Sequence, residues 1–194
     1  MSEVQVDKEL KEAKRKSAKP MLWVSLISMV MFFAGLTSAY IVSAKREDWV
    51  SFDLPQAFYI STALIVLSSI TLFISQSFLK KDDLKKSRMF LLAALGLGLA
   101  FVWYQYVGFK ELESLGLYFT GPKSTVSTSF VIGITFIHVL HLLAGVLVLF
   151  VVIYNHFKKK YSSANMLGFE LGAIFWHFVD LVWILLFLFF KFYK

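Results

Sequence analysis

Residues 171–190 read LGAIFWHFVDLVWILLFLFF, a block in which Asp180 carries the only formal charge. About 20 apolar residues are what an α-helix needs to cross the hydrocarbon core of a bilayer. Four blocks of similar character precede it, at residues 21–44, 57–79, 89–108 and 130–154. The sequence therefore predicts an all-α membrane protein with five transmembrane helices.

The composition supports this fold class. Apolar residues make up 58% of the 194 residues and charged residues 17%, whereas a soluble domain has about 25% charged residues. The five blocks take up more than half of the chain, which leaves a basic, solvated tail at residues 1–20 and a single membrane domain at residues 21–194. Because the chain has no cysteine, disulfides, thiolate metal sites and cysteine nucleophiles are excluded.

The positive charges alternate between segments along the chain. Fourteen of the 20 Lys and Arg residues lie in the tail, in the segment before residue 89 and in the segment before residue 171, and the other segments share six. The positive-inside rule then predicts a cytoplasmic N-terminus and a periplasmic C-terminus. Cytoplasmic loops thus account for the net charge of +7, and no nucleic-acid partner is expected.

Ionisable residues at membrane depth are costly, and they usually face the interior of a helix bundle or a cavity. This chain has five such candidates: His138 and His141 in the fourth block, His177 and Asp180 in the last block, and Glu170 directly before the last block. His138 and His141 are three positions apart, as are His177 and Asp180, and residues at this spacing share one face of a helix. We expect a buried network of imidazole and carboxylate groups between these two helices.

Three interpretations of these residues compete. A metal site has only His-x-x-His in its favour, without a third ligand at a diagnostic spacing, and a proton relay lacks an evenly spaced polar ladder. We favour a structural role, in which the groups hold the helices together and offer hydrogen bonds to a polar guest such as a lipid headgroup. No catalytic residue and no metal ligand is predicted.

Small residues four apart can allow close helix contact in membranes, although they can equally face lipid. Three such pairs occur, namely Gly35 with Ala39, Gly96 with Ala100, and Gly168 with Gly172.

Residues 168–170, GFE, and 175–183, FWHFVDLVW, resemble the last helix of subunit III of the haem-copper respiratory oxidases. Residues 138–141, HVLH, followed by Gly145, resemble the paired-histidine helix of that family, and residues 32–35 (FFAG) and 95–97 (LGL) through Gln105 extend the likeness. The version that the chain resembles is the short form with five helices.

The resemblance implies a non-catalytic subunit of a proton-pumping terminal oxidase in a bacterial cytoplasmic membrane, most simply of the cytochrome c oxidase type. Such a subunit flanks the catalytic subunit I, binds phospholipid in a cleft, and leaves haem and copper to its partner subunits; a respiratory supercomplex is a further setting. Four His residues, with His156 placed in a loop, and no Cys agree with the lack of cofactors. Subunit III of a quinol oxidase, an accessory subunit of nitric oxide reductase, and a small ion or proton transporter are the alternatives.

Two positions depart from the family pattern. Met29 stands where many members carry a Glu in the first helix, and Gly108 stands where many carry a Glu three residues after Gln105. Any role in proton supply that the family assigns to the first of these carboxylates is therefore not expected here.

Overall fold

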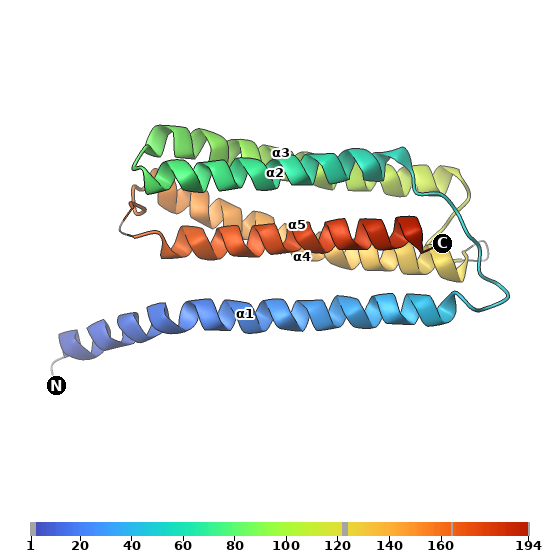
Figure 1. Ribbon diagram of the computed structural model, residues 1–194, viewed down its shortest axis with the longest axis horizontal. Helices are drawn as coiled ribbons and strands as arrows, with labels where there is room; N and C mark the ends of the chain where they lie inside the picture. The colour runs from blue at the N-terminus through green and yellow to red at the C-terminus, as the bar shows by residue number, and fades with distance from the viewer. Residues whose placement is uncertain (1–2, 122–123, 164, 194) are drawn as a thin grey trace.

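The computed structural model describes the backbone of residues 3–121, 124–163 and 165–193, and the side chains from residue 12 onward within these ranges, except residue 14. It contains five α-helices: α1 (Glu3–Ser43), α2 (Gln56–Lys80), α3 (Leu84–Ser114), α4 (Val126–Phe157) and α5 (Leu167–Phe192) (Figure 1). All five are long and apolar enough to cross a membrane. The predicted fold class is therefore confirmed, whereas the orientation of the termini stays a prediction.

The helices are longer than the apolar blocks that predicted them. Asp83 begins α3 by accepting a hydrogen bond from the Lys86 backbone N–H at 3.2 Å, and Thr125 begins α4 by accepting one from Thr128 N–H at 3.2 Å. Both are side-chain N-caps, which satisfy backbone donors at a helix start. The extra turns therefore carry the helices beyond the expected hydrocarbon core.

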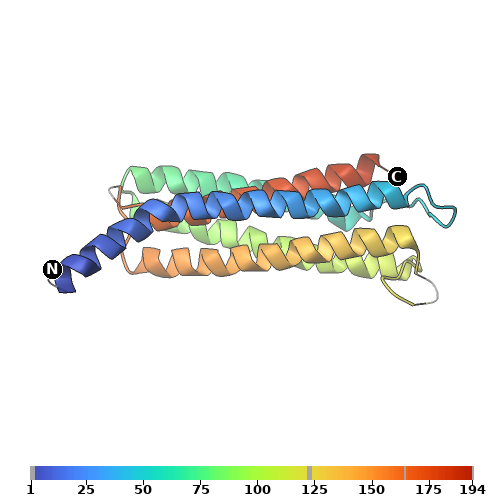
Figure 2. The same ribbon diagram turned by 90° about the horizontal axis from the view of Figure 1, so that it is seen from below.

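Helix α1 also includes residues that were predicted to form a separate solvated tail. Residues 12–19 read EAKRKSAK, which is rich in strong helix formers, and the helix continues through Pro20. Figure 2 shows that the N-terminal part of α1 bends away from the rest of the helix. A proline inside a helix removes one backbone donor and clashes with the preceding turn, which produces such a bend.

The helices form a bundle of four to which α1 is added from one side. Helices α2 and α3 form an extensively packed antiparallel hairpin, which lies against α4 and α5, while among the described residues α1 packs only against α4 and α5 (Figures 1 and 2). The N-terminal end of α1, the α2–α3 turn and the α4–α5 loop lie at one end of the molecule, and the C-terminus lies at the other. We call the end that holds the α2–α3 turn and the α4–α5 loop the basic end, because it carries most of the Lys and Arg residues.

The interior of the bundle is apolar and closely packed, with Leu72, Leu79, Leu91 and Leu149 completely buried. Large apolar side chains also cover the outside; Met31, for example, is 70% exposed. An outer surface of this kind suits a lipid environment, where apolar exposure carries no penalty.

The glycines of the three small-residue pairs differ in how closely other side chains approach them. A Cβ at Gly172 would lie 2.7 Å from Val152 Cγ2, and one at Gly168 would lie 2.8 Å from the Tyr161 hydroxyl. A Cβ at Gly35 or Gly96 would meet nothing within 4 Å. Close packing therefore requires the glycines at the start of α5.

Two segments far apart in the chain meet at the basic end. Asp82, in the α2–α3 turn, accepts hydrogen bonds from the Ser163 backbone N–H at 2.8 Å and from the Ser163 hydroxyl at 2.7 Å. These bonds favour the carboxylate and hold the pKa of Asp82 below its usual value. The α2–α3 turn is thereby tied to the α4–α5 loop.

Candidate functional site

His138 lies in the middle of the bundle and is completely buried. Its ring contacts those of Trp183, Phe33 and Phe101, with centroids 5.3, 6.1 and 6.3 Å away, so the imidazole is surrounded by aromatic side chains from α5, α1 and α3. Within the described part of the chain, neither ring nitrogen has a hydrogen-bond partner. The contacts of His138 are therefore those of an aromatic core residue.

His141 faces α1 instead of the bundle interior. Its Nδ1 donates to the Ile137 carbonyl at 2.9 Å, one turn earlier in α4, and its ring lies 5.5 Å from that of Phe33. Phe33 thus lies between the two imidazoles, in contact with both rings. The paired histidines of α4 form one side of the contact between α4 and α1.

His177 and Asp180 lie next to α2. The Ser69 hydroxyl forms a hydrogen bond with His177 Nδ1, and the Ser69 side chain also faces the Asp180 carboxyl. Asp180 is 2% exposed, and among the described residues neither of its carboxylate oxygens has a hydrogen-bond partner. The two ionisable residues of α5 are brought together around Ser69 rather than bonded to one another.

Glu170 lies at the basic end, outside the bundle interior. It forms an ion pair with Lys19 of α1 at 2.7 Å, with the side chains 29% and 50% exposed. Across the described residues, no hydrogen bond or ion pair joins any two of the five predicted site residues. The structure therefore distributes them over three places: the α1–α4 contact, the α2–α5 contact, and the basic end.

A series of buried serines was missed by the sequence analysis. Ser61, Ser68 and Ser75 of α2 are completely buried and are spaced by seven residues, so they follow one face of the helix. The expectation that the chain has no evenly spaced polar ladder was therefore wrong. The spacing of seven is the signal that could have revealed it.

Each of these serines bonds to another helix. Ser61 accepts a hydrogen bond from Gln105 Nε2 at 3.1 Å. Ser68 donates to the Ala94 carbonyl at 2.8 Å and accepts from Trp176 Nε1 at 3.1 Å, which joins α2, α3 and α5 at one point. Interhelical hydrogen bonds of this kind contribute to association where lipid offers no partner.

The third serine leads to a histidine that was predicted to lie in a loop. Ser75 donates to the Ser87 carbonyl at 2.7 Å, and a hydrogen bond of 3.1 Å joins the Ser87 hydroxyl to His156 Nε2. His156 is in the last turn of α4 and is 1% exposed. The loop prediction was wrong because α4 continues beyond the apolar block to Phe157.

Trp176 of α5 fills the space left by two glycines. A Cβ at Gly98 of α3 would lie 2.6 Å from Trp176 Cη2, and one at Gly145 of α4 would lie 3.2 Å from Trp176 Cε3. The indole therefore packs directly against the backbones of both helices, while its N–H is bonded to Ser68.

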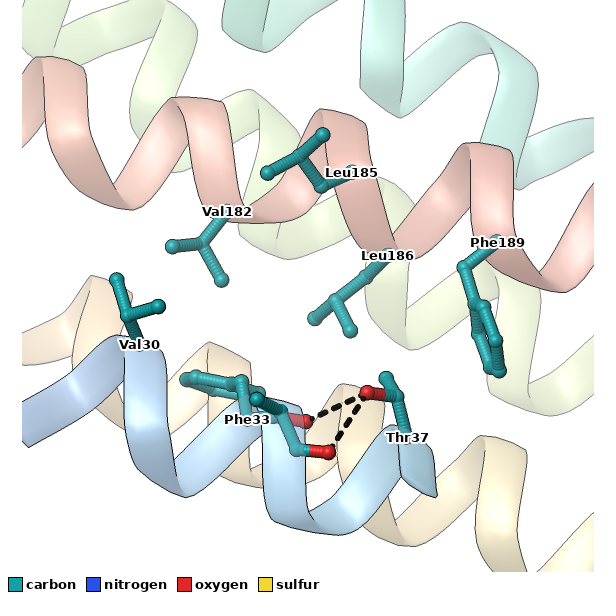
Figure 3. A pocket seen from close by; sticks show the side chains of 8 residues that line it. Val30, Phe33, Thr37, Val182, Leu185, Leu186 and Phe189 are labelled. Atoms are coloured by element: carbon teal, nitrogen blue, oxygen red, sulfur yellow. Dashed lines mark hydrogen bonds between the residues drawn. The ribbon is translucent and has the colours of Figure 1, made fainter. Parts of the chain in front are cut away.

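Two apolar hollows lie beside α1 where it meets α4 and α5. One, of about 300 Å³, lies between α1 and α5, where Val30 and Phe33 face Val182, Leu186 and Phe189 (Figure 3). The Thr37 hydroxyl at its edge bonds back to carbonyls of its own helix at 3.0 and 3.1 Å, so it adds no free donor to the hollow.

The second hollow lies nearer the basic end. It has a volume of about 460 Å³ and is lined by Leu22 of α1 together with residues of α4 and α5, and Asn155 and Tyr161 supply its polar atoms. We refer to the two hollows together as the α1 cleft. Its apolar walls fit acyl chains rather than a polar substrate.

The four imidazoles do not converge. In the part of the chain that the structure describes, no three His, Asp or Glu side chains are close enough together to hold a metal ion. His138 lies among aromatic rings, while the other three donate to or accept from separate partners. The four imidazoles therefore lie at separate places in the bundle, each with its own surroundings.

The family model for cytochrome c oxidase subunit III matches residues 3–194. The chain belongs to this family. The predicted relationship to subunit III of the haem-copper oxidases is thus confirmed over nearly the whole chain.

Individual members of the subunit III family show the same similarity. The chain is 29% identical over 174 residues to the cytochrome c oxidase subunit 3 of Thermostichus vulcanus, covering 86% of this chain and 82% of the relative. It is 31% identical over 173 residues to that of Corynebacterium diphtheriae, covering 85% and 82%. It is also 25% identical over 185 residues to the cytochrome bo(3) ubiquinol oxidase subunit 3 of Buchnera aphidicola, covering 93% and 96%.

The structure places the two positions where this subunit III departs from the family pattern. Met29 is partly buried against the bundle, on the side of α1 that carries Phe33. A Cβ at Gly108 would lie 3.2 Å from Phe58 Cζ, so the Phe58 ring fills the space beside this glycine. Apolar side chains therefore surround both positions in this member of the family.

Proposed function

We propose that this chain is the non-catalytic subunit III of a proton-pumping cytochrome c oxidase in a bacterial cytoplasmic membrane. The observation that carries the proposal is the match of the subunit III model to residues 3–194. Haem and copper reside in partner subunits, and this chain packs against the catalytic subunit and stabilises it during turnover. The internal hydrogen bonds of Ser61, Ser68 and Ser75 make the bundle a firm support for that contact.

The same subunit holds structural lipid. The α1 cleft supports this role, because its walls are apolar and its volumes, about 300 and 460 Å³, are large enough for acyl chains. His177 of α5 strengthens the contact between α2 and α5 through its hydrogen bond with Ser69.

A quinol oxidase is the second candidate, favoured by the similarity to the ubiquinol oxidase subunit 3 of Buchnera aphidicola. Two of the relatives described above are cytochrome c oxidase subunits. Electron donors bind to other subunits, so the subunits that co-purify with this chain identify the donor.

The test is to purify the native complex through a C-terminal tag in mild detergent, to record reduced-minus-oxidised haem spectra, and to identify the co-purifying chains by mass spectrometry. Co-purification of a haem-bearing catalytic subunit together with a copper-binding subunit is the expected result. A haem-bearing catalytic subunit without a second, separate copper-binding subunit indicates the quinol oxidase. Recovery of the chain alone, without haem, would refute the oxidase proposal and favour a transporter, which proton-flux measurements in liposomes would then examine.

A further inference from the structure

The basic end carries more positive charge than its own carboxylates can neutralise. Between residues 80 and 88 and between 155 and 166 the chain has two acidic residues, Asp82 and Asp83. Asp82 is bonded to Ser163, and Asp83 forms an ion pair with Lys86 at 3.2 Å. The same segments contain eight cations, which are Lys80, Lys81, Lys85, Lys86, Arg88, Lys158, Lys159 and Lys160.

Arg88 is held in a defined position among them. Its guanidinium lies over the Phe157 ring, 4.3 Å from the centroid. Within the described residues Arg88 forms no ion pair, and its covered Nε has no hydrogen-bond partner. A cation fixed on an aromatic ring without a carboxylate is prepared to receive an anion.

A second cation and a row of apolar side chains adjoin it. Lys158 follows Phe157 in the sequence, and its Nζ lies over the Tyr154 ring, 4.4 Å from the centroid. Phe157, Tyr154 and Phe150 are 50%, 57% and 48% exposed and follow one another at helical spacing toward the middle of α4. The surface thus has two cations at the end of the helix and an apolar row that continues into the membrane.

We propose that the α3–α4 edge at the basic end binds an anionic phospholipid, with Arg88 and Lys158 on its phosphate and its acyl chains along Tyr154 and Phe150. Arg88 lies in the second turn of α3, roughly 6 Å along the helix from Leu84 at 1.5 Å per residue, which suits the headgroup layer rather than the hydrocarbon core. Basic pockets between helices at this depth bind lipid phosphates. The apolar row favours a lipid over free phosphate as the source of the anion.

This site is separate from the α1 cleft, because Arg88, Lys158, Tyr154 and Phe150 are not among the residues that line either hollow of that cleft. It depends on α3 and α4 alone, so it does not rest on the identity of the partner subunits. Its failure and the failure of the oxidase proposal are therefore distinguishable.

The test is a lipid titration of the full-length chain, with whichever subunits co-purify, followed by native mass spectrometry. Dioleoylphosphatidylglycerol is the probe and dioleoylphosphatidylcholine the comparison. We expect Arg88→Gln to weaken phosphatidylglycerol binding by about tenfold more than the matched Lys85→Gln variant, since both remove one charge but only Arg88 is fixed on a ring. Lys158→Gln is a second variant that leaves Arg88 and its ring contact in place, and we expect it to weaken binding as well.

Three results would overturn the proposal. Equal phosphatidylglycerol binding by Arg88→Gln and Lys85→Gln would mean that only non-specific charge attraction holds the lipid. Displacement of phosphatidylglycerol by an excess of inorganic phosphate would indicate a site for the free ion. Loss of a partner subunit from Arg88→Gln, with lipid binding unchanged, would mean that a carboxylate of that subunit meets the arginine.

Discussion

Trp176 is the residue on which the packing of three helices depends. Its indole lies against the backbones of α3 and α4 at Gly98 and Gly145 and is bonded to Ser68 of α2. A side chain that is completely buried and directed by a hydrogen bond cannot be displaced without disturbing every helix around it.

We expect Gly98→Ala to destabilise the chain by about 1–3 kcal/mol, the usual effect of an added methyl group in a packed core. The new Cβ would lie 2.6 Å from Trp176 Cη2 and Cζ2, atoms of a rigid ring. Denaturant unfolding in detergent micelles measures the loss. Gly96→Ala is the matched control, since its Cβ would meet nothing within 4 Å, and an equal loss there would show that the ring contact is not the cause.

Asp82 gives a pH-dependent prediction outside the membrane. Its folded pKa is lowered by the hydrogen bonds from Ser163, so their contribution is fully present above the unfolded pKa, about 4, and is lost as the pH falls through the folded value. We expect Asp82→Asn to reduce the drop in thermal midpoint between pH 7 and pH 3. Asn tolerates the left-handed backbone found here, φ 56°, and an unchanged drop would contradict the assignment.

The five ionisable site residues illustrate what the sequence can predict. The depth of His138, His141, His177 and Asp180 follows from their positions within apolar blocks, and Asp180 and His138 are indeed buried. Their partners could not be predicted, because Ser69 and Lys19 lie on helices far away in the chain. Which face of α4 turns toward α1 depends on tertiary packing, and a spacing of three residues leaves that undecided.

At the level of the helices, the polar face of α2 provides the testable feature. Ser68 donates to α3 and accepts from α5, so its loss leaves the Trp176 N–H without a partner in an apolar interior. We expect Ser68→Ala to lower the free energy of unfolding by about 1–2 kcal/mol. Ser77→Ala is the control, because that exposed hydroxyl bonds only to the Phe73 carbonyl of its own helix; a comparable effect of both variants would refute the interhelical role.

The five helices could be predicted from hydropathy, whereas their ends could not. Asp83 and Thr125, which begin α3 and α4, are polar and lie outside the apolar blocks, so a search for apolar runs passes over them. The buried serines were missed for a related reason, since a small hydroxyl interrupts an apolar block without changing its average. The heptad spacing becomes informative only when it is examined together with the neighbouring helices.

In the whole molecule, α1 is attached to the bundle by polar contacts near both ends and packs on α4 between them through Phe33. At the basic end Lys19 pairs with Glu170. At the other end the Tyr40 hydroxyl donates to the Tyr193 carbonyl at 3.3 Å, and the Tyr40 ring contacts Trp49 at 4.8 Å. The α1 cleft lies between these attachments, so we expect its width to depend on them as well as on the apolar contacts of Phe33.

The ion pair between Lys19 and Glu170 gives the test of this arrangement. Each single variant, Lys19→Glu or Glu170→Lys, places like charges together, and we expect it to favour a wider separation of α1 and α5 at the basic end. The double variant should restore the original separation, with a coupling of about 0.2–1 kcal/mol, as for other exposed pairs. Because the chain has no cysteine, pairs of spin labels on introduced cysteines can measure the distance between the two helices.

Exchange of Lys110 and Glu113 is the matched control, since this ion pair lies within α3 at 2.8 Å with side chains 57% and 51% exposed. It should leave the distance between α1 and α5 unchanged. High salt should abolish the difference between the single and double variants, because at 1 M ionic strength exposed charges are screened within about 3 Å. If the distance between α1 and α5 changes neither on charge reversal nor in high salt, apolar contacts across the cleft alone position α1. The cleft would then be a fixed feature of the bundle.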